Sequence, residues 1–372
     1  MEPDRTSFDP PPQLRETDRD IRQSGLDPDF WYPLARSAEV AQGKPYGCEF
    51  AGEPIVLVRT EQNGLFALED RCAHRQVPLR YGVVRGDLLQ CGYHCWTYDH
   101  TGKCVAIPYR SPEMEACPRV RSYPVREACG LVFVFPGDPE KAATVPFPKF
   151  PRFEDSRYRT RYLDRRVNAH YSFMHENLMD MNHQFLHRRY MGSIRATCLG
   201  HEEGKDWSEV RYTFARVGGR QSAGERFMIK TGKSTGTGER DHALMIIRTD
   251  YPYQTLQFWP KHSTEPALDL WNCYIPLGPD QRVNHTYGLM MIKKPSVPGL
   301  MHLLWPAIAW FTDRIFAEDR WIVELEQSAF DKQGADRNCE IFPPIRALRR
   351  VLVANGTTLK SAAGQAASRQ RE

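Results

Sequence analysis

Four metal-binding side chains in two short segments constrain this chain more than any other feature. The segments are Cys72-Ala73-His74 and Cys91-Gly92-Tyr93-His94, separated by sixteen residues. Each supplies one thiolate and one imidazole, as required by a [2Fe–2S] cluster with two cysteines on one iron and two histidines on the other. A structural zinc site is the alternative, but zinc usually takes paired cysteines from one turn and paired histidines from a helix. The mixed order therefore favours the iron–sulfur cluster.

A second candidate metal site follows some ninety residues later. Residues 168–189 show helical periodicity and contain neither Pro nor Gly, which predicts one helix. His183 and His187 are spaced i, i+4 and so share a face of that helix, with Asp180 on the same stripe. Two histidines and one carboxylate are typical of mononuclear non-heme Fe(II), and they leave positions open for O2. Alone, such a histidine pair is equally compatible with ordinary surface or core residues.

The two motifs together resemble those of the Rieske non-heme iron oxygenases, over nearly the whole chain. Residues 91–102 resemble the second cluster loop of that family, and 177–187 resemble its Asn-x2-Asp-x2-His-x4-His helix. The match departs at one point, because only three residues separate His183 from His187 where four are usual. The first loop lacks the extra cysteine of respiratory Rieske proteins, so Cys95 is expected to be a buried thiol without a partner. The Asn-Leu-Met-Asp stretch at 177–180 is similar to the monooxygenase and demethylase branch.

The resemblance also implies roles that spacing alone does not give. The third iron ligand comes from the C-terminal helix, where Asp319 is the first choice and Glu318 and Glu324 are the alternatives. Asp180 is expected to link a cluster histidine of one subunit to an iron ligand of the next, which implies a head-to-tail homotrimer. Asn177 is expected beside the iron. The fallback iron ligands are His170 and His175, and a solvated charge run is the other interpretation of residues 318–324.

The expected fold class is α+β, in two domains joined by a Pro-rich connector. Residues 29–138 are predicted to form an all-β Rieske [2Fe–2S] domain, with a hairpin at Asn63-Gly64. Residues 139–355 are expected, by resemblance, to form a helix-grip (Bet v1/START-like) catalytic domain with an antiparallel sheet and a helix near 312–330. The terminal segments 1–28 and 356–372 are predicted to be flexible. The apolar stretch 300–311 is open to three interpretations: pocket lining, ordinary core or a membrane-facing lid.

Composition limits the classes of partner. The chain has 372 residues and a net charge of +4 without a long basic run, so no nucleic-acid partner is expected. No signal segment or membrane span is predicted, and the expected location is the cytoplasm. No dinucleotide fingerprint is present, so a separate NAD(P)H-dependent reductase or ferredoxin is expected to supply electrons. The resemblance implies hydroxylation or oxidative demethylation of an aromatic or bulky apolar small molecule with O2. Cis-dihydroxylation and non-catalytic electron transfer are the alternatives.

Overall fold

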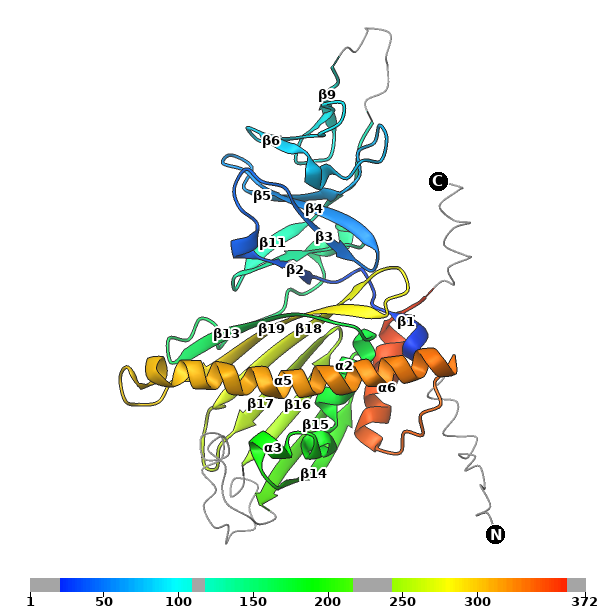
Figure 1. Cartoon of the computed structure of the whole chain (residues 1–372). Helices are drawn as coiled ribbons and strands as arrows, with labels where there is room; N and C mark the ends of the chain where they lie inside the picture. Colours follow the sequence, from blue (N-terminus) through cyan, green and yellow to red (C-terminus); the bar gives the residue numbers. More distant parts are fainter. Residues whose placement is uncertain (1–20, 109–117, 217–242, 360–372) are drawn as a thin grey trace. The chain divides into compact units, whose positions relative to one another are not determined.

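The computed structural model describes residues 21–108, 118–216 and 243–359, which fall into two compact units (Figure 1). The first unit contains the described residues of 27–154 together with 275–287. The second contains the described residues of 21–26, 155–274 and 288–359. This division assigns residues 275–287 to the first unit, which the linear sequence did not indicate.

The first unit is all-β, with three antiparallel sheets of order β10-β5-β4-β3, β11-β12-β2 and β6-β7-β8-β9. The predicted hairpin is present, because β4 and β5 pair antiparallel and the amide of Thr60 donates to the carbonyl of Gly64. Short 3-10 helices connect some strands. The elements are β2 Tyr32–Arg36, η2 Ser37–Glu39, β3 Tyr46–Phe50, β4 Glu53–Arg59, β5 Leu65–Glu69, η3 Leu79–Tyr81, β6 Val83–Arg85, β7 Leu88–Gln90, β8 Thr97–Tyr98, β9 Cys104–Ala106, β10 Ser122–Tyr123, β11 Val125–Ala128, β12 Leu131–Val134 and η4 Pro139–Ala143.

The second unit is built on a seven-stranded sheet of order β13-β19-β18-β17-β16-β15-β14. Every pairing from β14 to β18 is antiparallel between chain neighbours, so the sheet grows as a meander. This is the antiparallel sheet that was expected within residues 139–355. The bounds are β13 Tyr158–Val167, β14 Ile194–Glu203, β15 Trp207–Arg216, β16 Leu244–Asp250, β17 Tyr253–Trp259, β18 Leu268–Leu277 and β19 Val283–Lys293.

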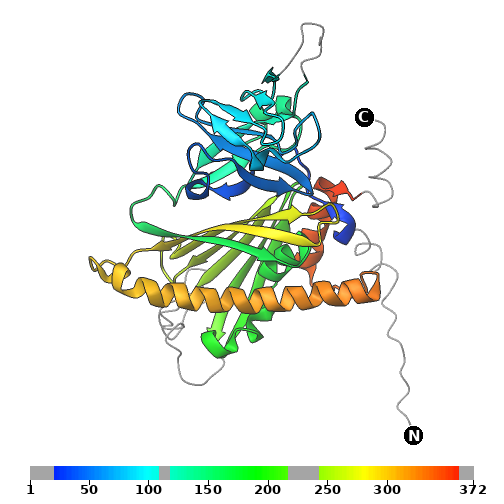
Figure 2. The ribbon, with the colours of Figure 1, turned by 45° about the horizontal axis from the view of Figure 1, so that its top comes forward.

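A long helix, α5 Leu300–Gln333, crosses one face of this sheet (Figures 1 and 2). It begins twelve residues before the predicted start, directly after Gly299, and Pro306 lies within it. The other helical elements are α2 Tyr171–Met179, η5 Met181–Phe185, α3 Arg188–Met191 and α6 Pro343–Asn355. The expected α+β class with an antiparallel sheet is confirmed. No helix in the described part of the chain is both long and apolar enough to cross a bilayer.

Two short terminal pieces correct the expectation of flexible tails at 1–28 and 356–372. Residues of η1 Ile21–Gln23 are largely buried, and β1 Ser24–Gly25 pairs antiparallel with β20 Thr357–Thr358. Arg22 explains the order, because its guanidinium lies 2.5 Å from the carboxylate of Glu176 in α2. A buried charge with a buried partner fixes a segment that its polar composition suggested would be free. Residues 1–20 and 360–372 lie outside the described residues.

Candidate metal centres

The two predicted cluster loops, 72–77 and 91–96, have the same backbone geometry. In each loop the amide of the cysteine donates to the carbonyl five residues later, and the amide four residues later donates to the cysteine carbonyl. That fourth residue, Gln76 or Cys95, has a positive φ of 60° or 58°. Cys95 is therefore an exposed turn residue and not the buried thiol that was expected. Two equivalent turns present two equivalent Cys/His pairs.

The four predicted cluster ligands have side chains suited to a [2Fe–2S] cluster. Cys72 and Cys91 are each 2% exposed and belong to the same hydrophobic core. The imidazole rings of His74 and His94 have centroids 4.6 Å apart, at the more accessible side of the loops. The hydroxyl of Tyr98 lies 3.2 Å from Sγ of Cys72, where it can donate to a thiolate. Buried thiols beside accessible imidazoles fit the two-Cys, two-His ligation of this cluster.

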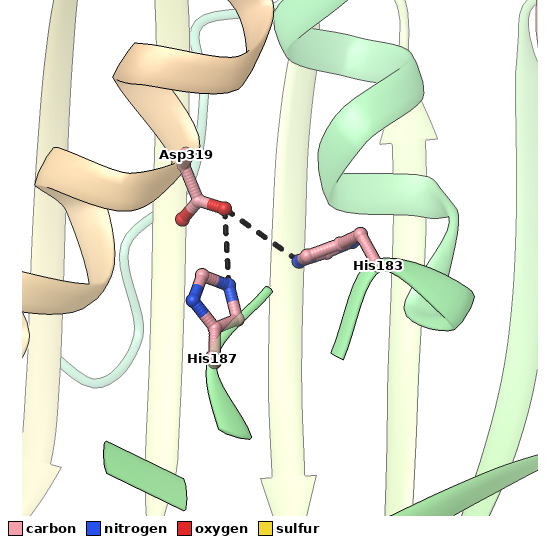
Figure 3. Close-up of side chains that lie close together, drawn as sticks. All are labelled: His183, His187 and Asp319. Atoms are coloured by element: carbon pink, nitrogen blue, oxygen red, sulfur yellow. Dashed lines mark ion pairs between the residues drawn. The ribbon is translucent and has the colours of Figure 1, made fainter. Parts of the chain in front are cut away.

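The second site is a group of three side chains from two distant parts of the chain. His183, His187 and Asp319 each offer a ligand atom, and these atoms all lie within 4.8 Å of one another. Oδ1 of Asp319 is 3.1 Å from Nε2 of His187 and 3.6 Å from Nε2 of His183 (Figure 3). Asp319 belongs to α5. His183 lies in η5, directly after α2, and His187 precedes α3. The predicted first-choice residues are thus the ones that meet.

The atoms that face away from this group are held by other polar groups. Nδ1 of His187 is 2.9 Å from the carboxylate of Glu318, and Nδ1 of His183 contacts the carbonyl of Asp180. Asn177 donates from Nδ2 to Oδ1 of Asp319 at 3.1 Å. Nε2 of His187 is buried and faces Oδ1 of Asp319. Both imidazoles are therefore oriented to present Nε2 to a shared point, as a bound Fe(II) requires.

Electrostatics make this point attractive to a cation. Burial alone would raise the pKa of Asp319, but the hydrogen bond from His187 and the charges of both histidines hold it below its ordinary value. Burial disfavours the charged form of His187, yet hydrogen bonds and charges from Asp319 and then Glu318 outweigh it and raise the pKa of His187. The group therefore favours a positive charge beside Asp319, whether a proton or a metal ion.

The backbone that carries the two histidines is not the single helix that was predicted. The helix α2 ends at Met179, and Asp180 adopts an extended backbone whose side chain accepts from the amide of Asn182 at 2.8 Å. The chain then continues as η5, so His183 and His187 do not share a face of one α-helix. Their rings still lie with centroids 5.1 Å apart at 86°. An Asp at this position is a strong N-cap, and that signal was available in the sequence.

The alternative ligands are elsewhere or have another role. Glu324 pairs with Arg320 and accepts from Asn168, away from the three-residue group. His170 caps α2 through Ser172, and His175 is buried against Tyr274. Neither belongs to the candidate metal group. Glu318 contacts the outer nitrogen of His187, a supporting role that the sequence did not predict.

A cavity of about 590 Å³ adjoins the three-residue group. Its wall is formed by α5, by the segment from Leu178 to Met191, and by strands β16 to β19. Most of the lining side chains are apolar, and the charged Lys293 is paired with Glu265 at 2.8 Å. The apolar lining includes Leu178, Met181, Met191, Met245, Leu256, Phe258, Leu268, Leu270, Met290, Ile292, Leu304, Ile308, Trp310, Phe311, Ile315 and Phe316.

Comparison with known proteins gives matches in both units. Residues 30–124 match the Rieske [2Fe-2S] domain family, and residues 167–347 match the C-terminal domain family of vanillate O-demethylase oxygenase. The 4beta-methylsterol monooxygenase of Methylococcus capsulatus is 29% identical over 350 residues, covering 90% of this chain and 89% of that protein. The oxygenase component of dicamba O-demethylase from Stenotrophomonas maltophilia is 36% identical over 159 residues, covering 42% and 47%. A crystal structure of dicamba monooxygenase bound to dicamba superposes with a TM-score of 0.69 at 23% identity, covering 91% and 98%.

Proposed function

Because this chain belongs to the Rieske non-heme iron oxygenases, we propose that it inserts one oxygen atom of O2 into a C–H bond of a bulky, neutral, apolar molecule. An electron pair and two protons would reduce the other oxygen atom to water. On this proposal residues 29–138 bind the cluster, and residues 139–355 bind the mononuclear iron and the substrate.

One observation carries the proposal: His183, His187 and Asp319 converge at the wall of an apolar cavity. A protein that only carried electrons would need neither a second metal site nor a chamber beside it. Two histidines and one carboxylate occupy a single side of an iron and leave its other side open. In this chain the open side would face the cavity, which is where a substrate would lie.

The side chains around both sites have distinct tasks. Cys72, His74, Cys91 and His94 would hold the cluster, and His183, His187 and Asp319 would hold the iron. When bound, the cluster supplies single electrons and the iron supplies O2 activation. Glu318 accepts from Nδ1 of His187 and so fixes the tautomer that exposes Nε2. Asn177 keeps Oδ1 of Asp319 aimed at the histidines. The apolar cavity wall excludes water from the substrate.

The cavity indicates the class of substrate. Pockets of roughly 300–1,000 Å³ accept ligands of drug size, and 590 Å³ lies within that range. Lys293 is already neutralised by Glu265, so it offers little to an anionic substrate. The methylsterol monooxygenase aligns along nine-tenths of this chain, which favours a methyl carbon on a large apolar skeleton as the oxidised position. We therefore propose a sterol-like or other polycyclic neutral substrate.

Electron supply and assembly complete the proposal. A separate NAD(P)H-dependent reductase, with or without a ferredoxin, would reduce the cluster. We propose that the protein works as a homotrimer in which Asp180 links the cluster histidines of one subunit to His183 of the next. The support is local: Asp180 contacts Nδ1 of His183 through its carbonyl, and its carboxylate lies on a partly exposed turn.

Metal content tests the iron site. The protein would be purified without oxygen, and iron and acid-labile sulfide would be measured per chain. The wild type should hold about three irons and about two sulfides, and Asp319→Asn and His183→Ala should each hold about two irons with an unchanged cluster spectrum. Glu324→Gln is the matched control on α5 and should keep all the iron. About two irons in the wild type would overturn the oxygenase proposal and leave an electron-transfer protein.

Isotope incorporation tests the reaction. The protein would be supplied with a surrogate ferredoxin and reductase, 18O2 and a panel of methylsterols, methoxylated aromatic acids and unsubstituted arenes. One 18O atom in a hydroxymethyl product would support the proposal. Two 18O atoms in a cis-diol would replace monooxygenation by dihydroxylation. Turnover of the aromatic acids alone would contradict the proposed substrate class while leaving the oxygenase assignment intact.

A further inference from the structure

The N-terminal third of α5 lies between the cavity and solvent. Some of its side chains line the cavity, and others are exposed at the molecular surface. Leu304, Ile308 and Phe311 line the cavity from this segment. Trp310 lines the cavity as well, yet 54% of it is exposed. Leu303, seven residues before Trp310 and so on the same side of the helix, is 77% exposed. One stretch of helix is therefore both cavity wall and molecular surface.

This surface is apolar and aromatic, and its charged neighbours are cations. No acidic residue occurs between Lys294 and Thr312. The ring of Trp310 packs against Tyr190 of α3, with centroids 5.9 Å apart. Val297, in the loop before α5, is 59% exposed. We call the surface formed by Tyr190, Val297, Leu303 and Trp310 the portal face.

Arginines stand against the aromatic rings of the portal face. The guanidinium of Arg314 lies 5.8 Å from the ring centroid of Trp310, and that of Arg189 lies 5.7 Å from the ring centroid of Tyr190. Asp313, the nearest acidic residue along α5, is engaged by Arg161 at 2.7 Å and also pairs with Arg165. The face therefore combines apolar side chains with a cationic rim.

We propose that the portal face binds the surface of an anionic phospholipid bilayer and that the substrate enters the cavity there. Tryptophan and tyrosine with adjacent arginine or lysine are the residues that favour the lipid–water boundary. Basic residues near an anionic bilayer are attracted to its negatively charged surface. A second protein is a weaker occupant, because the described charges of the rim have one sign. This route of substrate entry rests on the proposed oxygenase function, and it does not depend on which C–H bond is oxidised.

The apolar cavity explains why a membrane-binding surface would be useful at this place. Molecules that match an apolar chamber of about 590 Å³ partition into membranes and are scarce in water. A chamber whose outer wall rests on the bilayer receives them without passage through water. The binding is peripheral, since none of the described helices is suited to span a bilayer.

Vesicle flotation tests the proposal with the full, cofactor-loaded chain. Vesicles of phosphatidylcholine alone would be compared with an equal mixture of phosphatidylcholine and phosphatidylglycerol. The wild type should float with the mixed vesicles and less with the neutral ones. Leu303→Glu should reduce binding by about tenfold or more, because a leucine side chain leaves the apolar layer and a charge enters it. Arg314→Gln should lower the preference for the anionic vesicles.

A matched control distinguishes binding through the portal face from non-specific binding through any exposed apolar side chain. Ile341 precedes α6 and is 72% exposed, close to the value for Leu303. Ile341→Glu should float like the wild type. Iron and sulfide content and circular dichroism would verify that each variant is folded. Failure of the wild type to float, or equal flotation of Leu303→Glu and Ile341→Glu, would overturn the proposal. Dissociation of an oligomer by Leu303→Glu in the absence of vesicles would assign the face to a subunit contact instead.

Discussion

His187 lies between two carboxylates in the candidate iron site. One nitrogen faces Asp319 and the other faces Glu318, so two carboxylates favour its protonated form. Burial favours the neutral form, but the effect of the carboxylates is larger, so the pKa of His187 is raised above its ordinary value of 6.5. A protonated imidazole cannot bind a metal. Protons and iron therefore compete for Nε2 of this residue.

This competition predicts a pH dependence of metal binding. As the pH falls through the raised pKa of His187, the affinity of the iron-free protein for Fe(II) should fall. Glu318→Gln removes one of the groups that raise this pKa, so the midpoint of the loss should move to lower pH. Anaerobic Fe(II) titrations across a pH series would give both midpoints. An unchanged or higher midpoint in Glu318→Gln would contradict this account of the two carboxylates.

Asp180 combines two roles that substitution can separate. Its side chain caps η5 through Asn182, and its carboxylate is the proposed link between subunits. Asn is as good an N-cap as Asp. Asp180→Asn should therefore keep its iron while product formation falls by about 10- to 100-fold. Asp180→Ala should also lose part of its iron, because the cap that positions His183 is gone. Iron content and product per cluster oxidised would be measured together, and full activity in Asp180→Asn would exclude the linking role.

At this scale the sequence pointed to the candidate ligands more readily than to the residues that support them. The mixed Cys/His spacing predicted four cluster ligands, and the family resemblance favoured Asp319 among three neighbouring carboxylates, the one that lies beside His183 and His187. Glu318 was considered only as a ligand, because nothing in a linear sequence shows which nitrogen of a distant histidine a carboxylate will meet. The exposure of Cys95 depends on a positive φ in a turn, which residue type alone does not predict.

At the scale of elements, buried ion pairs hold α2 against η1 and α6. Glu176 lies 2.5 Å from Arg22 and 2.5 Å from Arg349 of α6, and both arginine side chains are 2% exposed. Burial alone would raise the pKa of Glu176, but the two arginines outweigh it and lower that pKa. The triad of Arg22, Glu176 and Arg349 ties η1, α2 and α6 together, seven residues before His183, the first candidate iron ligand in the chain. It was missed because charged residues are usually expected at the surface.

Loss of the central carboxylate should be costly. Glu176→Gln leaves two buried arginines without a countercharge and should lower the free energy of unfolding by about 3 kcal/mol or more. The exposed pair between Glu203 and Arg350 provides the matched control, and Glu203→Gln should cost about 0.5 kcal/mol or less. Because the pKa of Glu176 is lowered, its contribution is complete above pH 4.5 and is lost as the pH falls through the folded-state pKa. Urea unfolding followed by circular dichroism would check both values.

Element boundaries show where local pattern failed. The apolar periodicity of 168–189 predicted one helix, but the capping geometry of Asp180 divides it into α2, η5 and α3. The helix expected near 312–330 also includes the apolar stretch 300–311, and it contains Pro306, because a proline near the start of a long helix removes only one hydrogen bond. Strands β13 and β14 carry little apolar alternation. Strand β15 does alternate, with Val210, Tyr212 and Phe214 separated by polar residues, and this strand signal was overlooked.

At the scale of the whole molecule, the two proposed metal sites belong to different compact units. The first unit presents His74 and His94 at accessible turns, and the second holds the iron ligands beside Asp180. If electrons pass between subunits in a ring, each cluster serves the iron of a neighbour. A chain without a cluster could then be complemented by a chain without a mononuclear iron.

Mixed assemblies test this arrangement quantitatively. Cys72→Ser would disable the cluster, Asp319→Asn would disable the iron, and each variant alone should be inactive. Every mixed trimer holds two chains of one kind and one of the other, so about one of its three directed contacts pairs an intact cluster with a neighbour's intact iron. Product formation by the mixed trimers should therefore recover to about a third of the wild-type rate. Transfer within one chain predicts no recovery, because every chain then lacks one of its two metal sites. Differently tagged chains, co-expressed and purified through both tags, would ensure that mixed assemblies are measured.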